Sequence, residues 1–297
     1  MTGRLLTLPA TKELLERAGA APRRSLGQNF VVDPNTVRRI ARLAGVGPGD
    51  RVVEIGAGLG SLTLALAETG AEVVAVETDS RFVPLLREVV SSFSTSCEPD
   101  FAEPGGARPG PVRIVHADAR RMDWSALLPG NGWHVVANLP YNIATSLVLT
   151  VLDEVPAVTR LLVMCQREAA ERLAAAPGDG VYGAVSVRVA VHADAELAGA
   201  VPATVFFPQP EVESALVRIT RRAPSMESHL RAEVDRLVTA AFAHRRQMLR
   251  RTLRNALDDA DGTLARAGVE GTDRPERLGL AEWVRLAEAA LGKPARG

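Results

Sequence analysis

The stretch Arg51-Val-Val-Glu-Ile-Gly56-Ala-Gly58-Leu-Gly60-Ser61 decides the fold of this chain. A short β-branched run is followed at once by three glycines at every second position, and an apolar helical pattern begins at Ser61. This order of buried strand, tight turn and helix predicts the first unit of a doubly wound α/β domain. Glycines suit such a turn because the backbone can approach a ligand without an intervening Cβ.

The spacing of the glycines narrows the class of ligand. A dinucleotide fingerprint has the form G-x-G-x-x-G, whereas here the third glycine comes one residue early and Glu54 precedes the turn. This arrangement is similar to the first motif of S-adenosylmethionine-dependent methyltransferases. Another nucleotide-binding variant, or a turn with a purely structural role, is an open alternative at this point.

Composition bounds the protein class. The 297 residues are 46% hydrophobic and 24% charged with a formal net charge of +0, which is ordinary for a globular protein. Cys97 and Cys165 have no metal-binding spacing, so we expect two reduced thiols and no metal site. Because the chain shows no apolar run of ~18 residues and no signal-peptide core, we expect a cytoplasmic protein without membrane contact.

The next predicted strands end in side chains suited to a nucleoside. The strand at 72–77 ends in Glu77, ~20 positions after the glycine turn, where a carboxylate can accept hydrogen bonds from both ribose hydroxyls. A surface carboxylate is the alternative. The strand at 112–118 leaves Asp118 at its carboxyl end, where it could bind the exocyclic amine of an adenine.

The tetrapeptide Asn138-Leu139-Pro140-Tyr141 follows a fourth predicted strand, at 133–137. An exocyclic adenine amine is a poor nucleophile because its lone pair is delocalised into the ring. Two hydrogen-bond acceptors, the Asn138 side-chain oxygen and a backbone carbonyl fixed by Pro140, would favour a pyramidal, reactive nitrogen. Tyr141 offers a face for base stacking, worth ~1–3 kcal/mol. We therefore predict methyl transfer to an adenine amine without a general base; an ordinary turn with a buried tyrosine is the alternative.

A segment without periodicity interrupts the alternation of strands and helices, and a predicted hairpin ends the sheet. Residues 94–111 are rich in Ser, Pro, Gly and Ala, and we predict a surface insertion there. Runs near 196–201 and 213–219 predict the closing hairpin of the sheet. The loop between them carries Phe206, which is either a core residue or a second stacking face opposite Tyr141.

The chain beyond Arg222 is predicted to be wholly helical, which gives an α/β domain with its N-terminal arm at 1–222 and a small C-terminal helical domain at 223–297. Residues 231–254 contain seven arginines and two acids. Arg246, Arg250 and Arg254 recur every fourth residue, which predicts a basic face on an amphipathic pair of helices. A solvated face is the usual meaning of such a pattern, but the lack of compensating acids between His244 and Arg254 favours phosphate binding.

Taken together, these motifs resemble the ribosomal RNA adenine dimethyltransferases, most closely the KsgA type that acts on small-subunit rRNA. The resemblance covers nearly everything from Arg23 to Leu291. Besides the residues above, the matching motifs are Leu26-Gly-Gln-Asn-Phe30, Gln166-Arg-Glu, Tyr182-Gly, Pro208-x-Pro-x-Val-x-Ser214 and Phe242-Ala-His-Arg-Arg246. The resemblance implies a Rossmann-like S-adenosylmethionine-dependent methyltransferase sheet followed by a small all-helical domain.

The resemblance also implies roles for particular residues. The cofactor, S-adenosyl-L-methionine, would lie against Asn29, Val31, Gly56, Gly58, Glu77, Asp118 and Asn138. Tyr141 and Phe206 would sandwich the target base, beside Asn138, Leu139 and Pro140. This replaces the solvated arm that composition alone predicts for residues 1–30. We expect the RNA to contact Arg23, Arg24, Arg245, Arg246, Arg250 and Arg254.

The family reaction is four methyl transfers onto two adjacent adenosines near the 3′ end of small-subunit (16S) rRNA, with the assembling 30S subunit as partner and a monomeric enzyme. Two alternatives compete with it. A large-subunit rRNA methyltransferase of the macrolide-resistance type usually has isoleucine where this chain has Leu139. A non-catalytic assembly factor would not need Glu77 or the intact tetrapeptide. Departures from the family pattern are Val31 for leucine, Ala57 for proline and Gln247 for lysine.

Overall fold

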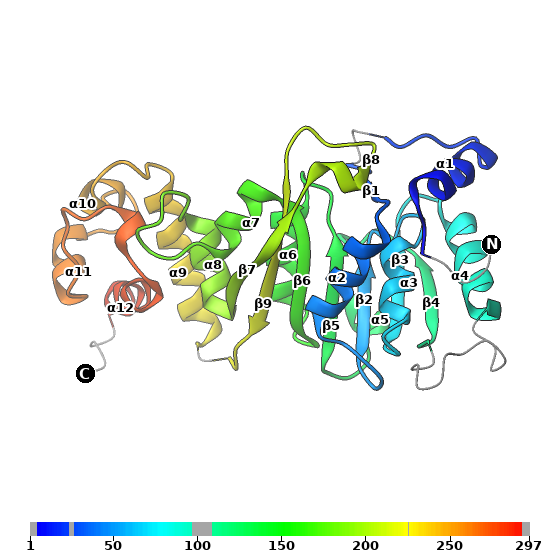
Figure 1. Ribbon diagram of the computed structural model, residues 1–297. Helices are drawn as coiled ribbons and strands as arrows, with labels where there is room; N and C mark the ends of the chain where they lie inside the picture. Colours follow the sequence, from blue (N-terminus) through cyan, green and yellow to red (C-terminus); the bar gives the residue numbers. More distant parts are fainter. Residues whose placement is uncertain (1–4, 24–26, 97–108, 225, 293–297) are drawn as a thin grey trace. The chain divides into compact units, whose positions relative to one another are not determined.

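The computed structural model describes residues 5–23, 27–96, 109–224 and 226–292 (Figure 1). The chain packs as two compact units: Met1–Ala170 with Leu197–Thr220, and Glu171–Glu196 with Arg221–Gly297. Arg24, Cys97 and most of the insertion predicted at 94–111 lie outside the described residues. None of the described helices has the length and apolar character needed to cross a bilayer.

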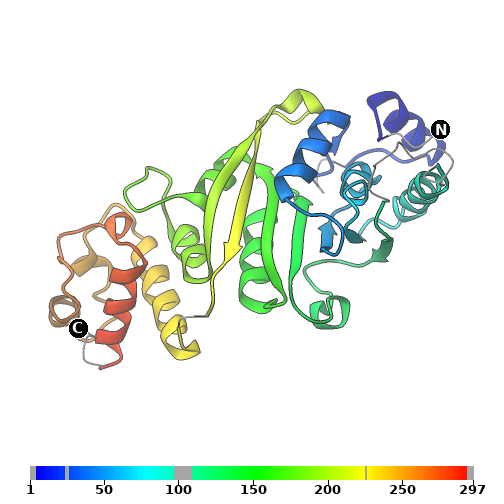
Figure 2. The ribbon, with the colours of Figure 1, turned by 60° about the horizontal axis from the view of Figure 1, so that its bottom comes forward.

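The first unit is built on a sheet with the strand order β4-β3-β2-β5-β6-β9-β7. The strands are β2 (Arg51–Ile55), β3 (Glu72–Glu77), β4 (Val112–His116), β5 (Trp133–Asn138), β6 (Val158–Gln166), β7 (Ala193–Val201) and β9 (Ser214–Arg221). β2 pairs in parallel with both β3 and β5, and β6 pairs in an antiparallel manner with β9, which lies beside it in Figure 2. The chain order reverses between β2 and β5, where doubly wound sheets bind ligands. The predicted Rossmann-like fold is confirmed.

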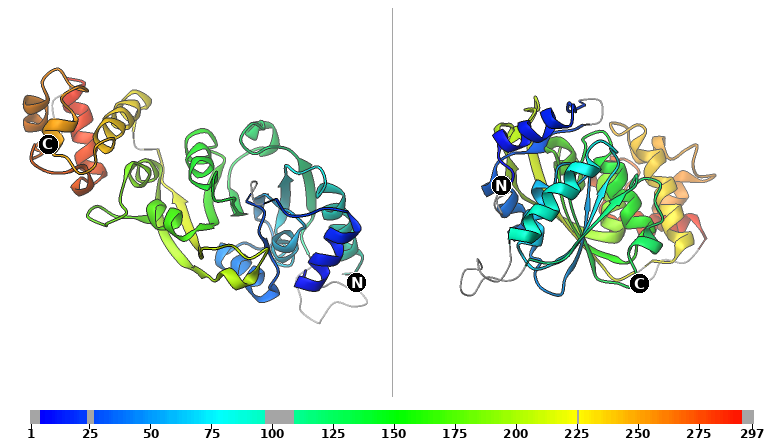
Figure 3. Two further views of the ribbon diagram at one scale, coloured as in Figure 1. Left: turned by 90° about the horizontal axis from the view of Figure 1, so that it is seen from above. Right: turned by 90° about the vertical axis from the view of Figure 1, so that its right-hand side faces the viewer.

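Helices cover both faces of this sheet. On one face, α2 (Pro34–Ala44), α3 (Ser61–Ala67) and α4 (Val83–Ser96) share an apolar core with side chains from β2, β3 and β6. On the other face lie α5 (Trp124–Leu127) and α6 (Ala144–Glu154), as the edge-on view in Figure 3 shows. The last four residues of β2 and the first five of β5 are buried, as expected for a sheet that is covered on both faces.

The N-terminal arm is part of the packed structure. α1 (Leu8–Arg17) buries Leu14 and Leu15, and the Arg17 guanidinium lies 2.7 Å from the Glu88 carboxylate on α4. β1 (Phe30–Val31) then forms a short antiparallel pair with β8 (Phe206–Phe207), which follows the 3₁₀ turn η3 (Ala203–Val205). The solvated arm expected from composition alone is therefore wrong, and these contacts hold residues 27–31 over the carboxyl ends of β2 and β5.

The second unit is helical and includes more of the chain than the predicted 223–297. Its helices are α8 (Ala184–His192), α9 (Ser228–Phe242), α10 (Leu249–Thr252), α11 (Ala260–Arg266), η4 (Pro275–Arg277) and α12 (Leu280–Ala290), with the end of α7 (Arg167–Ala174). Tyr182 and Trp283 are fully buried at its centre, and the Tyr182 hydroxyl donates to the Leu278 carbonyl at 2.8 Å. Residues 171–196 thus supply core side chains to this unit.

The arginine-rich segment contains the predicted pair of helices, but Arg246 lies in the turn between them and not on a helical face. α9 ends at Phe242, and α10 begins only at Leu249. The Leu249 N–H donates to the Asp273 carbonyl, and the Arg250 N–H donates to the Gly271 carbonyl. These long-range hydrogen bonds fix a turn where the local periodicity favours helix, so Arg246 and Arg250 belong to different elements.

Candidate active site

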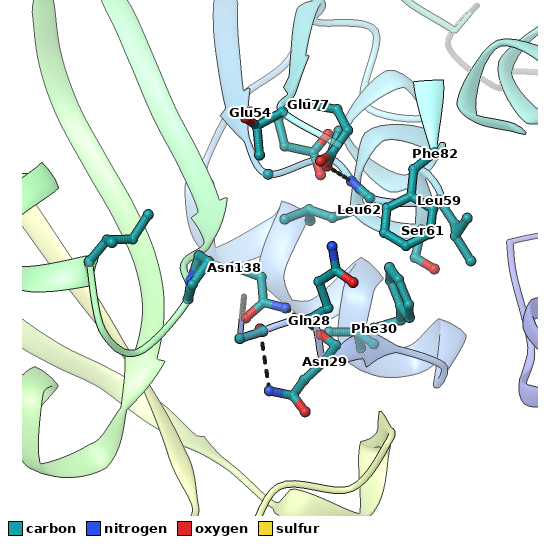
Figure 4. Close-up of a pocket in the computed structure, with 18 of the residues that line it drawn as sticks. Gln28, Asn29, Phe30, Glu54, Leu59, Ser61, Leu62, Glu77, Phe82 and Asn138 are labelled. Carbon is teal, nitrogen blue, oxygen red and sulfur yellow. Dashed lines mark hydrogen bonds between the residues drawn. The ribbon is translucent and has the colours of Figure 1, made fainter. Parts of the chain in front are cut away.

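A cavity of about 180 Å³ opens at the carboxyl ends of β2, β3 and β5, at the switch point of the sheet (Figure 4). The arm, the glycine turn and the end of β5 each contribute to its wall. Of the predicted cofactor residues, it is lined by Asn29, Val31, Gly56, Gly58, Glu77, Asp118 and Asn138. The structure therefore brings together side chains that are as far apart in sequence as Asn29 and Asn138.

The glycine turn is so tight that residues with a side chain fit poorly at Gly58 and Gly60. Gly58 has a φ of 57°, and a Cβ there would lie 3.0 Å from the Phe30 ring. Gly60 has a φ of 94°, and its Cβ would lie 2.8 Å from Leu86. L-residues rarely adopt these conformations. Gly58, which lines the cavity, therefore exposes bare backbone to it, as a closely approached ligand requires.

Glu77 lies in the wall of the cavity with its carboxylate fixed by the backbone. The Gly58 N–H donates to Oε2 and the Asp79 N–H donates to Oε1, each at 2.7 Å. Burial raises the pKa of Glu77, although these backbone hydrogen bonds act in the opposite direction. Each carboxylate oxygen retains a further lone pair, so two hydroxyl groups of a ribose could still donate to it.

Glu54 is a second buried carboxyl group, to which the sequence assigned no role. The Thr63 hydroxyl donates to Glu54 Oε2, and burial together with the nearby Glu77 raises the pKa of Glu54 to about 8. The group is therefore a neutral acid over much of the physiological range. Its position two residues before Gly56 was the only sequence feature that pointed to it.

Asp118 lines the cavity, but it has a partner that the sequence analysis missed. The Arg120 guanidinium contacts both Asp118 oxygens, at 3.1 and 2.7 Å, and it lowers the pKa of the carboxyl group. Arg120 also lines the cavity. The chain thus presents an ion pair, and not a lone carboxylate, where the adenine amine was expected.

Asn138 stands at the end of β5, where its amide is oriented by the arm. Its Nδ2 donates to the Asn29 backbone carbonyl at 2.9 Å, which leaves Oδ1 as an acceptor. The Pro140 carbonyl accepts from the N–H groups of Ile143 and Ala144, both at 3.1 Å. The Leu139 carbonyl accepts no hydrogen bond from any described residue. It is therefore an unpaired backbone acceptor next to Asn138 in the chain, in a residue that is 2% exposed.

A second cavity of about 390 Å³ adjoins the first. The two cavities share Gly27, Asn29 and Asn142 in their walls. Tyr141 lines the second cavity, and its hydroxyl lies 2.9 Å from the buried Ser214 hydroxyl. This contact fixes the ring, and burial raises the pKa of the phenol. The other lining residues are Gln166, Gln209, Pro210, Glu211 and Val212.

Phe206 does not form the predicted sandwich with Tyr141 in this structure. Its side chain is 4% exposed, lines neither cavity, and packs in the core that the sheet shares with α2 and α3. The cause is the β1–β8 ladder, which pairs Phe206 with the equally buried Val31. Of the two alternatives for Phe206, the core position is the one observed.

The arm contains a further residue that the sequence analysis left without a role. The Gln28 amide donates from Nε2 to Asp79 at 2.9 Å and accepts from the Arg23 N–H at 2.8 Å. Asp79 also bonds to Glu77 through its backbone. Gln28 therefore links the arm to the same segment that fixes the Glu77 carboxylate.

The predicted RNA-binding arginines of the helical unit fall into two groups. Arg246, Arg250 and Arg254 are exposed, and none forms an ion pair with another described residue. Arg245 instead lies 2.9 Å from the Glu276 carboxylate and donates to the Gly180 carbonyl at 2.7 Å. Arg245 is thus bound within the unit and is less available to RNA than the other three.

The residues of the first cavity fit S-adenosylmethionine. The bare glycine turn accommodates a closely packed ligand, Glu77 offers oxygens for ribose hydroxyls, and Asn138 lines the cavity with Oδ1 as an acceptor. Together with the switch point of the sheet, this arrangement defines an S-adenosylmethionine-dependent methyltransferase.

Comparison with known proteins specifies the class further. A family model described as ribosomal RNA adenine dimethylase matches residues 19–290, and the chain belongs to this family. It is 44% identical over 288 residues to the ribosomal RNA small subunit methyltransferase A of Thermobifida fusca, covering 96% of each chain. The protein of the same name from Acidothermus cellulolyticus is 42% identical, over 94% of this chain and 92% of that one.

Solved structures share the fold. The 23S rRNA methyltransferase ErmE aligns with a TM-score of 0.65 and 26% identity, covering 88% of this chain and 99% of that chain. A dimethyladenosine transferase from Plasmodium falciparum aligns with a TM-score of 0.69 and 20% identity, over 86% and 94% of the two chains. These likenesses extend over both units of the present chain.

Proposed function

We propose that this protein dimethylates the N6 amines of two adjacent adenosines near the 3′ end of small-subunit rRNA, with S-adenosylmethionine as methyl donor. We further propose that it acts as a cytoplasmic monomer on the assembling 30S subunit. The observation that carries the proposal is the Asn138 Oδ1 acceptor in the wall of the first cavity, where the bond from Asn138 Nδ2 to the Asn29 carbonyl orients the amide, with the unpaired Leu139 carbonyl next to it in the chain.

The two acceptors suit an adenine amine. Each can take a hydrogen bond from one N–H, which draws the nitrogen toward a pyramidal geometry with its lone pair directed at the first cavity. Bound S-adenosylmethionine supplies an electrophilic methyl group on its sulfonium. Because the amine can lose its proton after transfer, the site needs no general base. After the first methylation one N–H remains for one acceptor, so the same geometry serves the second transfer.

The second cavity is the proposed place of the target base. Tyr141 presents a π-face there, and its hydroxyl bond to Ser214 fixes the ring in position. Stacking on a single fixed face contributes ~1–3 kcal/mol, and Phe206 would contribute a second face only if its ring left the core. The cavity opens beside Gln209 and Glu211, through which the flanking nucleotides could enter.

RNA affinity is proposed to come mainly from exposed arginines. Arg246, Arg250 and Arg254 are available for phosphates, whereas Arg245 is held by Glu276. Arg23 remains a candidate in the arm, where its backbone is anchored by Gln28. Contacts of this kind are independent of base sequence and weaken with added salt.

A large-subunit substrate is the second candidate, because ErmE, a 23S rRNA methyltransferase, shares the fold at 26% identity. The small-subunit substrate is favoured because the relatives at 42–44% identity carry the small-subunit name. The test is to incubate unmodified small and large subunits with labelled S-adenosylmethionine and to map the label by mass spectrometry. The proposal expects two adjacent dimethyladenosines in small-subunit rRNA; label in large-subunit rRNA alone would refute it.

A further inference from the structure

A third cavity lies at the amino ends of β5 and β6, at the opposite end of these strands from Asn138. Its volume is about 340 Å³, and it shares no residue with the cavities of the active site. The carboxyl end of α2 forms one side of it, and β5, β6 and β9 form the floor. Its polar lining consists of Arg42, His134, Arg160, Arg218 and Thr220.

The sheet register places the floor residues on one face. His134 is paired with Arg160, Arg160 with Thr220, and Arg218 lies two residues before Thr220 on the same strand. Paired residues and residues two apart project from the same side of a sheet. Arginines from β6 and β9 therefore meet a third arginine, Arg42 of α2, around one hollow.

Two of the three arginines around this hollow have no ion-pair partner among the described residues. Arg42 and Arg160 are exposed, and neither forms an ion pair with a described residue. The carbonyl end of α2 would by itself repel an anion. The Arg218 guanidinium, however, donates to the Leu43 carbonyl at 3.1 Å and so covers part of that end.

His134 supplies an independent observation. Its side chain is 8% exposed, it lines the cavity, and its Nδ1 has no hydrogen-bond partner among the described residues. Buried polar atoms are nearly always paired, and leaving one unpaired destabilises the folded state. An anion held by the arginines would give an imidazole N–H an acceptor.

We propose that this cavity binds a phosphate group through Arg42, Arg160, Arg218 and His134. Phosphate fits better than a monovalent ion, because guanidinium groups donate paired hydrogen bonds that match its oxygens and its double charge. The group can belong to free phosphate or to an RNA backbone. The proposal is independent of methyl transfer, because none of these residues touches the active site.

The test is a titration of the full-length protein with sodium phosphate, followed by NMR of the histidine ring nitrogens and by thermal unfolding. Sodium chloride at matched ionic strength is the reference. The His134 signal, assigned by its loss in His134→Phe, should shift saturably with phosphate only. Arg42→Gln and Arg160→Gln should each weaken binding about tenfold or more, as the loss of a charged hydrogen bond predicts. Arg87→Gln, which removes an exposed arginine from α4, is the matched control and should titrate like wild type.

His134→Phe keeps a flat ring but removes both nitrogens. It should unfold at least as cooperatively as wild type without phosphate, and phosphate should stabilise it less. A short RNA that displaces phosphate from wild type, but binds Arg160→Gln more weakly, would identify the RNA backbone as the source. Phosphate binding without such competition would identify a free anion. A His134 signal that responds equally to chloride, or Gln variants that titrate like wild type, would overturn the proposal.

Discussion

Replacing Glu77 by glutamine should weaken cofactor binding and loosen the glycine turn at once. In the structure, the two carboxylate oxygens each accept a backbone N–H at 2.7 Å, from Gly58 and from Asp79. A glutamine side chain has one oxygen acceptor and an NH₂ group that can only donate. One of the two backbone N–H groups must therefore lose its partner, and one ribose hydroxyl must lose its acceptor.

The expected losses in cofactor affinity and in stability follow from the number of hydrogen bonds that the substitution removes. A hydrogen bond to a charged group contributes ~1.5–3 kcal/mol, which corresponds to a roughly 10–150-fold weaker Kd for S-adenosylmethionine. An orphaned buried N–H costs a further ~1–3 kcal/mol in the free energy of unfolding. The larger loss is expected for Glu77→Ala, which removes both acceptors.

Calorimetric titration with S-adenosylmethionine, together with urea unfolding, measures both effects. Glu72→Gln is the matched control, because Glu72 lies on the same strand but is exposed. It should leave both the affinity and the unfolding free energy nearly unchanged. A Glu77→Gln protein that binds the cofactor as tightly as Glu72→Gln would refute the role assigned to this carboxylate.

Three further predictions concern other parts of the chain. Burial raises the pKa of Glu54 from 4.5 to about 8, so the stability that this group contributes is complete below pH about 4.5 and is lost as the pH rises toward 8. The unfolding free energy of wild type should therefore fall across this pH window relative to that of Glu54→Gln. Unfolding free energies that change in parallel with pH in the two proteins would contradict the assignment. The double variant Arg246→Gln and Arg250→Gln should lower the salt slope of RNA binding by ~1–2, whereas Arg17→Gln with Arg38→Gln, whose side chains are paired with Glu88 and Glu68, should keep it. Tyr141→Phe should raise the activation free energy of single-turnover methylation by only ~1 kcal/mol, the contribution of the hydrogen bond between the Tyr141 and Ser214 hydroxyls. A loss of rate as large as that of Tyr141→Ala would give the hydroxyl a chemical role.

The fold and the cofactor side of the site were predictable because their signals are local. A β-branched run, glycines with positive φ and a following helix are adjacent in sequence, and they form β2, the turn and α3. Parallel strands place their carboxyl ends at one edge of the sheet, so Glu77 and Asn138 necessarily meet near the turn. The alternation of strands and helices therefore determined which side chains the cavity could contain.

The features that the sequence analysis missed depend on contacts between distant segments. Phe206 is buried because β8 pairs with β1. Strands of two residues are too short to be predicted from the alternation of polar and apolar residues. The arginine stripe is interrupted because Leu249 and Arg250 bond to the loop at 271–273. Tertiary hydrogen bonds decided both cases against the local pattern.

Single-turnover methylation of unmodified small subunits by Asn138→Ala, at saturating S-adenosylmethionine, tests the proposed chemistry most directly. The alanine variant loses the Oδ1 acceptor and the hydrogen bond from Nδ2 to the Asn29 carbonyl, but it keeps Tyr141 and the exposed arginines. The rate of methyl transfer should fall by ~10²–10³, the scale for one preorganised polar contact, while RNA binding persists. An Asn138→Ala enzyme that transfers methyl groups at the wild-type rate would contradict the account.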